Sequence, residues 1–176
     1  MTLVRRKFLK MGGGILAAFS TPLPLRARSL EIIEMKGTPR GEQVWFAPQG
    51  LAVSVGTTIR FVNRDAGNGH TATTYHPDNF DRIRRIPKAA KPWNSDFLMP
   101  NESFEVMLTV PGVYDYYCIP HEMAAMVGRI VVGRPDEKGW EGESANVDDV
   151  PPEVLALFPK VDAILDKGRI ERVDKS

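Results

Sequence analysis

Apolar and polar positions alternate with a period of two in short runs between Leu30 and Gly133, and turn-forming residues separate these runs. The alternation is clearest in residues 57–63 and 103–110, where it places one set of side chains on each face of a strand. Strands are expected at 30–36, 43–47, 51–55, 57–63, 69–75, 103–110, 113–118 and 128–132. Many short antiparallel strands at this spacing predict an all-β sandwich or barrel.

One long connection, residues 76–94, interrupts the strand pattern. It contains three prolines and five basic residues, which are Arg82, Arg84, Arg85, Lys88 and Lys91. A connection of this length is usually functional or carries a helical turn. The alternative interpretation is a solvated charged face with no specific role.

The chain after Gly133 begins as an acidic stretch and then shows helical periodicity. The apolar residues that follow an i, i+3, i+4, i+7 spacing are Val154, Leu157, Phe158, Val161, Ile164 and Leu165. Pro159 is expected to divide this stretch into two short helices, and Gly168 to end the second. We therefore expect residues 134–176 to be an acidic linker and a short C-terminal helical extension that packs on the sandwich as a lid.

The first residues have the three-part pattern of a secretory signal: a basic start, an apolar stretch over 12–19 and a region suited to cleavage near Ser29. The run from Arg5 to Lys10 resembles the twin-arginine export motif. We expect residues 1–29 to send the folded protein to the periplasm, or to tether it to the membrane if the signal is not cleaved. A stable membrane span is not expected, because the apolar stretch is shorter than the ~20 residues that cross a bilayer.

Composition and charge narrow the possible functions. The chain has 176 residues, of which 43% are hydrophobic and 26% charged, as in a soluble domain with its own core. Six of the 23 basic residues precede the first acidic residue, Glu31, and without them 17 basic residues face 22 acidic ones, a net charge of −5. Nucleic-acid binding is therefore not expected, because phosphates require a basic surface.

Candidate chemistry centres on Cys118, the one cysteine of the chain. In an exported protein it has no intramolecular disulfide partner, so it is either a small buried apolar residue or a metal ligand. His121 and Met126 follow closely, and a thiolate, an imidazole and a thioether together suit copper that cycles between two oxidation states. Zinc fits less well, because its structural sites mostly use two or more cysteines and a thioether ligand is unusual.

A fourth ligand must come from elsewhere, and the other histidines are His70 and His76. His70 follows a glycine-rich turn at the start of an expected strand, where an antiparallel neighbour can bring it beside the cysteine. We favour it over His76, which directly precedes a proline. Met126 is favoured over Met123, because a single residue separates Met123 from His121. That is too little chain for Met123 to reach the axial position of the metal. The result is a plane of two histidines and a cysteine with a weak axial methionine.

The spacing of Cys118, two residues, His121, four residues and Met126, with a histidine upstream, resembles the ligand loop of the cupredoxins, most of all their plastocyanin and pseudoazurin branch. The resemblance covers residues 30–133 and implies a Greek-key β-sandwich with one type 1 copper ion per chain. It assigns His70, Cys118 and His121 to the strong plane and Met126 to the axial place.

Many of these relatives have an asparagine after the upstream histidine, which ties the two ligand loops together, whereas this chain has Thr71. A ligand set supplied wholly by the protein leaves no open position for a substrate, which points to one-electron transfer rather than catalysis. The resemblance implies that redox partner proteins dock near His121 on a monomer. If residues 82–91 lie beside that surface, their charge favours an acidic partner.

Two other functions compete with the electron carrier. A copper enzyme of the oxidase or nitrite reductase type needs several more histidines than the three of this chain. A module that binds and delivers copper is the alternative that the sequence leaves open.

Overall fold

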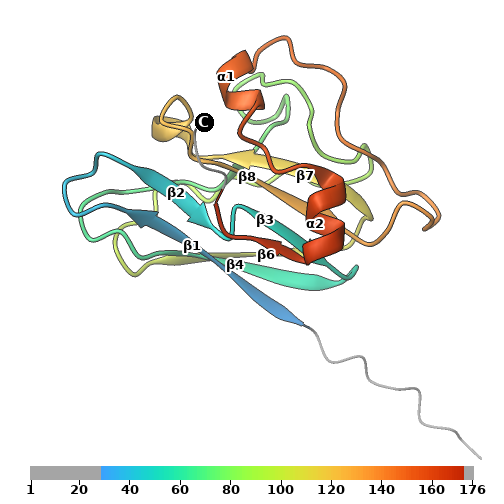
Figure 1. The fold of residues 1–176 in the computed structure, drawn as a ribbon, viewed down its shortest axis with the longest axis horizontal. Helices are drawn as coiled ribbons and strands as arrows, with labels where there is room; N and C mark the ends of the chain where they lie inside the picture. The colour runs from blue at the N-terminus through green and yellow to red at the C-terminus, as the bar shows by residue number, and fades with distance from the viewer. Residues whose placement is uncertain (1–28, 173–176) are drawn as a thin grey trace, which may run out of the picture.

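The computed structural model describes residues 29–172, which form two packed β-sheets with short helices against one of them (Figure 1). The first sheet has the strand order β2 (Val44–Ala47), β1 (Leu30–Gly37), β4 (Thr57–Asn63), β6 (Ser103–Leu108). The second has the order β5 (Thr73–Thr74), β7 (Gly112–Tyr117), β8 (Val127–Val132), β3 (Gly50–Val53), β9 (Arg169–Ile170). The expected all-β sandwich is confirmed. The expected signal lies outside the described residues except for its last position, Ser29.

Strand pairing is mixed, whereas the sequence pattern was interpreted as many short antiparallel strands. β1 runs parallel to β4, and β3 runs parallel to β8, whereas the other neighbouring strands are antiparallel. β2 and β3 belong to different sheets although only residues 48–49 separate them, so the chain crosses between the sheets there. Alternation of side chains reports the two faces of a strand and carries no information on its direction.

The boundaries of most expected strands agree with the structure to within two residues. The exception is 69–75, of which only Thr73–Thr74 forms β5, while His70 makes an isolated antiparallel bridge with Leu98. None of the expected strands corresponds to β9, which pairs with β3 at the edge of the second sheet.

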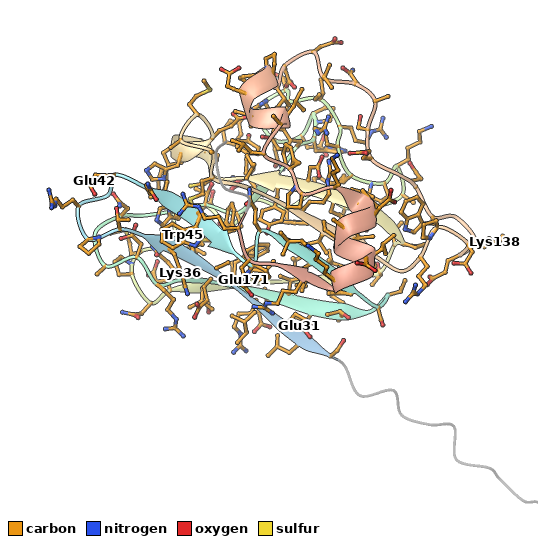
Figure 2. The ribbon with its side chains drawn as sticks, in the orientation of Figure 1. Glu31, Lys36, Glu42, Trp45, Lys138 and Glu171 are labelled. Carbon is orange, nitrogen blue, oxygen red and sulfur yellow. The ribbon has the colours of Figure 1, made fainter. Side chains whose placement is uncertain are left out.

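The main core lies between the sheets and is built from the inward positions of the alternating strands. It includes Ile33, Met35, Phe46, Ile59, Phe61, Tyr114, Tyr116, Ile130 and Val132. The ring of Tyr116 contacts Phe46 and Phe61 edge-on, with centroids 4.8 and 5.2 Å apart. Cys118 and Met126 belong to the same buried cluster. Figure 2 shows charged side chains on the outside, among them Glu31 and Lys36 of β1.

The C-terminal extension covers the outer face of the second sheet. Its helices are α1 (Pro152–Leu155) and α2 (Val161–Lys167), and Pro159 lies between them. Gly168, with a φ of 74°, ends α2. Ile164 of α2 packs with residues of β7 and β8, and Val154 of α1 packs beside Tyr117. Every residue of β7 and β8 is buried as a result. The expectation of two short helices packed on the sandwich is confirmed.

Charged residues also hold the extension to this face. Asp115 of β7 forms ion pairs with Arg129 of β8 and with Arg85 of the long connection, at 2.7 and 2.9 Å. Arg85 donates to the carbonyl oxygen of Asn146, and Arg129 pairs with Glu143, both in the extension. Buried charges must be paired and hydrogen-bonded to be tolerated. The long connection, the sheet and the extension therefore share one ionic cluster.

Candidate metal centre

The upstream candidate ligand, His70, lies in a connection fixed by a buried asparagine. Asn63, the last residue of β4, donates from Nδ2 to the carbonyl oxygens of Asn68 and Leu98, each at 2.8 Å. Two backbone hydrogen bonds between His70 and Leu98 then hold the histidine in place, at 2.8 and 3.1 Å. Its side chain is fully buried.

The other candidates come from the tight connection between β7 and β8. Cys118 follows β7 directly, His121 ends the single turn η1 (Ile119–His121), and Met126 precedes β8. The Cys118 N–H donates to the Met126 carbonyl at 3.0 Å, and the Met126 N–H to the His121 carbonyl at 3.1 Å. These bonds close the loop on itself, so the three side chains are presented by one rigid unit.

The donor atoms of the two connections converge at one end of the sandwich. The Nδ1 atoms of His70 and His121 are 3.1 Å apart, and the Cys118 Sγ lies 3.7 Å from the first and 3.4 Å from the second. Ligand atoms of all three residues lie within 4.8 Å of one another. The antiparallel pairing of β5 with β7 brings the two connections together, as expected for His70.

The two competing residues are placed differently. His76 lies outside this cluster, and its Nδ1 accepts a hydrogen bond from the backbone N–H of Asp78 at 3.1 Å. The side chain of Met123 is 65% exposed, whereas Met126 is fully buried in the core cluster that contains Cys118.

Thr71 ties the two ligand connections together. Its hydroxyl oxygen accepts from the Ile119 N–H at 2.9 Å, and its own N–H donates to the Cys118 Sγ at 3.3 Å. A hydrogen bond to the cysteine sulfur is one of the groups that set the properties of a metal site. Thr71 therefore ties the two connections together, the role that the resemblance implies for an asparagine at this position.

Burial and hydrogen bonding set the protonation of the donors in the metal-free site. Burial raises the pKa of the Cys118 thiol to about 11, against the opposing hydrogen bonds from Thr71 and His121. Burial and the neighbouring His70 lower the pKa of His121 below its ordinary value. A metal ion must therefore displace the thiol proton but meets a neutral imidazole at His121.

Asp65 is a polar partner of the site that sequence reasoning missed. Its carboxylate Oδ2 lies 3.0 Å from the His70 Nε2, and the side chain is 4% exposed. Although burial raises the pKa of Asp65, hydrogen bonds from Asn68, Gly67 and His70 outweigh it and hold this pKa below its ordinary value. The sequence signal was an aspartate two residues before a glycine, a common turn pattern.

A second missed group surrounds Glu122, the residue after His121. The Tyr75 hydroxyl donates to Glu122 Oε1 at 2.7 Å, and Arg82 holds both carboxylate oxygens at 2.8 and 2.9 Å. Arg82 also bonds to the side chain and carbonyl of Asp149 in the extension. The ligand loop is thus joined to the long connection and to the C-terminal extension.

Exposed apolar side chains surround the candidate centre. Pro120, Met123 and Ala124 of the loop between β7 and β8 are exposed. Phe97 and Met99, 60% and 55% exposed, add to this surface. Both lie against Gly69, the neighbour of His70.

The long basic connection contributes less free charge than its sequence suggests. Arg82 and Arg85 are engaged in the internal ion pairs described above. Arg84, Lys88 and Lys91 are exposed.

No helix among residues 29–172 is long and apolar enough to cross a membrane.

The chemistry of the donor set fits a copper ion. Two imidazole nitrogens, a buried thiol and a neighbouring buried thioether side chain provide soft and intermediate ligands. A donor set with one cysteine and a methionine does not match the common structural zinc sites, which use two or more cysteines. Oxygen ligands, which calcium and magnesium require, are absent from the group formed by His70, Cys118 and His121 among the described residues.

Comparison with known proteins gives the family. Residues 33–133 match the model of the copper binding proteins of the plastocyanin/azurin family. Chloroplastic plastocyanin of Pisum sativum is 32% identical over 127 residues, which cover 72% of this chain and 74% of that protein. Chloroplastic plastocyanin of Chlamydomonas reinhardtii is 39% identical over 88 residues, 49% of this chain and 57% of that protein. A Sinorhizobium pseudoazurin structure is 29% identical with a TM-score of 0.45, covering 61% of this chain and 76% of its own.

Proposed function

Since the chain belongs to the plastocyanin/azurin family of copper-binding proteins, we propose that it is an exported carrier of single electrons. His70, Cys118, His121 and Met126 hold its one type 1 copper ion. The observation that carries this proposal is the convergence of two imidazole Nδ1 atoms and one thiol sulfur within 4.8 Å. Copper in such a set supplies a one-electron couple between Cu(II) and Cu(I).

The protein's part is to hold the donors still and to leave no place for a substrate. Cys118 and Met126 are joined by a backbone hydrogen bond, and Thr71 fixes this loop to the connection that carries His70. Four protein donors leave no open coordination position, which catalytic metal sites keep. Donors fixed by the fold need little rearrangement when the charge of the centre changes, and this favours fast electron transfer.

The surface beside His121 is the proposed docking site for redox partner proteins. His121 is partly exposed, whereas the other proposed ligands are buried. Phe97, Met99 and Met123 supply exposed apolar area around the centre. Contacts of this kind between redox partners are small and short-lived, so they need little more than a modest apolar patch.

The exposed basic residues of the long connection are proposed to add an electrostatic contribution to docking. Arg84 and Lys88 are the residues to neutralise, because both are exposed. Arg85 is left unchanged, because it forms a buried ion pair with Asp115. The double variant is expected to reduce the salt dependence of the rate at which an acidic redox partner reduces the protein. An unchanged salt dependence would remove this connection from the docking surface.

The ligand set is tested with copper-loaded protein lacking the proposed signal. Wild type is expected to show an intense blue thiolate-to-copper band and a reversible voltammogram. Cys118→Ser abolishes the band, and Met126→Leu shifts it and the potential. Met123→Leu and His76→Ala are the matched controls and leave both unchanged. A colourless protein that binds only zinc would overturn the proposal.

The same experiment separates a carrier from a module that delivers copper. A carrier keeps its copper through many cycles of oxidation and reduction. A delivery module releases copper quickly to a competing chelator and shows no reversible couple. Rapid loss of this kind would replace electron transfer with delivery as the function of the centre.

Export is proposed to use the twin-arginine route, because Arg5 and Arg6 begin the basic run described above. Replacing both with lysine is expected to abolish periplasmic accumulation of the blue protein while cytoplasmic synthesis continues. Fractionation of the cells also shows whether the signal is cleaved or tethers the protein to the membrane. Normal export of the double-lysine variant would contradict the route.

A further inference from the structure

A buried carboxylate lies behind the ligand His70, on the side away from the other donors. The Nδ1 of His70 faces His121 and Cys118, while its Nε2 lies 3.0 Å from the Asp65 Oδ2. When Nδ1 binds a metal, Nε2 carries the ring hydrogen and donates it to the carboxylate. Asp65 thereby selects the tautomer and the ring orientation that metal binding requires.

The fold provides a specific place for this carboxylate. Oδ2 also accepts from the Asn68 side chain and Oδ1 from the Gly67 N–H, each at 2.9 Å. The Asp65 N–H donates to the Asn63 side-chain oxygen at 2.8 Å. A side chain at Gly37 of β1 would collide with the Asp65 carboxyl group. The end of β4, the connection that follows it and Gly37 of β1 therefore all contribute to the position of this carboxylate.

The charge of the carboxylate has a consequence for the metal centre. Asp65 is 4% exposed, so its negative charge is little screened by water. A hydrogen bond from a ligand imidazole to a carboxylate increases the electron density on the metal-binding nitrogen. Both effects favour the more highly charged oxidation state of a bound ion over the less highly charged one.

We propose that Asp65 is a positioning residue that fixes the tautomer of His70 and lowers the reduction potential of the copper centre. This inference rests on the proposed function, since it presupposes a redox-active copper ion at His70. It adds a residue outside the ligand set as a determinant of the potential.

Asp65→Asn tests the charge while preserving a side chain of the same shape. The ratio of Cu(I) to Cu(II) affinity is expected to rise about tenfold, which for one electron is a 59 mV increase in potential. Glu42→Gln is the matched control, because it removes an exposed carboxylate, 60% accessible, from the loop beside Asn68. The control is expected to leave the ratio unchanged. Equal potentials in Asp65→Asn and in wild type would overturn the proposal.

A second variant shifts the potential in the opposite direction. Asn68→Ala removes a donor that shares the Asp65 Oδ2 with His70, so the carboxylate interacts more strongly with His70 and the ratio falls. Asn68 is partly exposed, and its carbonyl bond to Asn63 is kept. If Asp65→Asn does not fold, this variant decides the question: a fall supports the proposal, and an unchanged or raised ratio overturns it.

A readout without redox chemistry separates failure of this inference from failure of the proposed function. In zinc-loaded protein, nitrogen NMR is expected to show the His70 Nε2–H as slowly exchanging in wild type and fast in Asp65→Ala. Slow exchange in both would overturn the positioning role. A wild-type protein without a reversible couple would instead contradict the proposed function, whatever the NMR result.

Discussion

Removing Arg82 should destabilise the protein strongly, because this side chain joins the ligand loop to the C-terminal extension. It holds both oxygens of Glu122, bonds to the carboxylate and carbonyl of Asp149, and lies 4.9 Å from the ring centres of Tyr75 and Tyr117. The two carboxylates hold the pKa of Arg82 above its ordinary value, although burial opposes them. Arg82→Ala leaves Glu122 with the Tyr75 hydroxyl and takes the guanidinium away from both rings.

The magnitude follows from the burial of the three charged side chains. Losing one partner of a fully buried ion pair costs about 3–5 kcal/mol. Arg82, Glu122 and Asp149 are 17%, 13% and 31% exposed, so the lower end of that range applies. The two cation–π contacts add about 0.5–1 kcal/mol each. We expect the free energy of unfolding to fall by about 4 kcal/mol.

Urea unfolding of the metal-free protein under reducing conditions measures this quantity without a contribution from metal binding. Arg84→Ala is the matched control and should change stability by less than about 0.5 kcal/mol, because Arg84 is exposed. Arg82→Lys keeps the charge but loses the two-pronged contact with Glu122, so its effect should lie between the two. A loss below about 1 kcal/mol for Arg82→Ala would refute the view that this contact holds the extension to the loop.

Three further outcomes are expected. Thr71→Ala removes the acceptor of the Ile119 N–H, so it should lower the free energy of unfolding in urea by about 1–3 kcal/mol and shift the blue band. Thr71→Ser keeps the hydroxyl and should preserve the stability and the band. Equal effects of the two substitutions would contradict the role of the hydroxyl. Gly128→Ala places a methyl group against the ring of Tyr116 and should lower stability by about 1–3 kcal/mol; a neutral result would show that the ring moves freely. Where the free metal concentration is 1,000 times its dissociation constant, removing the metal should lower the free energy of unfolding by about 4 kcal/mol. Calorimetry records this loss as a lower unfolding midpoint. An unchanged midpoint would mean that the unfolded chain binds metal equally well.

The proposed ligand loop could be read from the sequence because its donors are close together in the chain. Cys118, His121 and Met126 lie within one connection, and the chemistry of their side chains points to copper without knowledge of the fold. His70 was harder, since its place depends on strand pairing: β5 is only two residues long, yet its register with β7 sets the distance to the cysteine. Local pattern predicts strands well and long-range register poorly.

Asp65 and Glu122 show why the surroundings of the centre were not predicted. A charged residue near a turn or beside a ligand is usually solvated. The turn pattern of Asp65 also occurs at Asp166, so it does not single out a partner of the metal centre. Their partners are distant in sequence or depend on a turn conformation: Glu122 meets Tyr75 and Arg82, and Asp65 meets His70 across a glycine-rich turn. Such contacts exist only once the strands are placed.

The strands of the second sheet did carry a signal of the extension that covers them. A strand with one face in water should show polar residues at every second position, yet the outward positions of β7 include Val113 and Tyr117, and those of β8 include Val131. The charged outward residues, Asp115 and Arg129, pair with each other. An apolar outer face interrupted by one complementary charge pair predicts a covering layer with matching charges. The long connection and the C-terminal extension supply that layer, and through Arg82 they also reach the loop that carries His121.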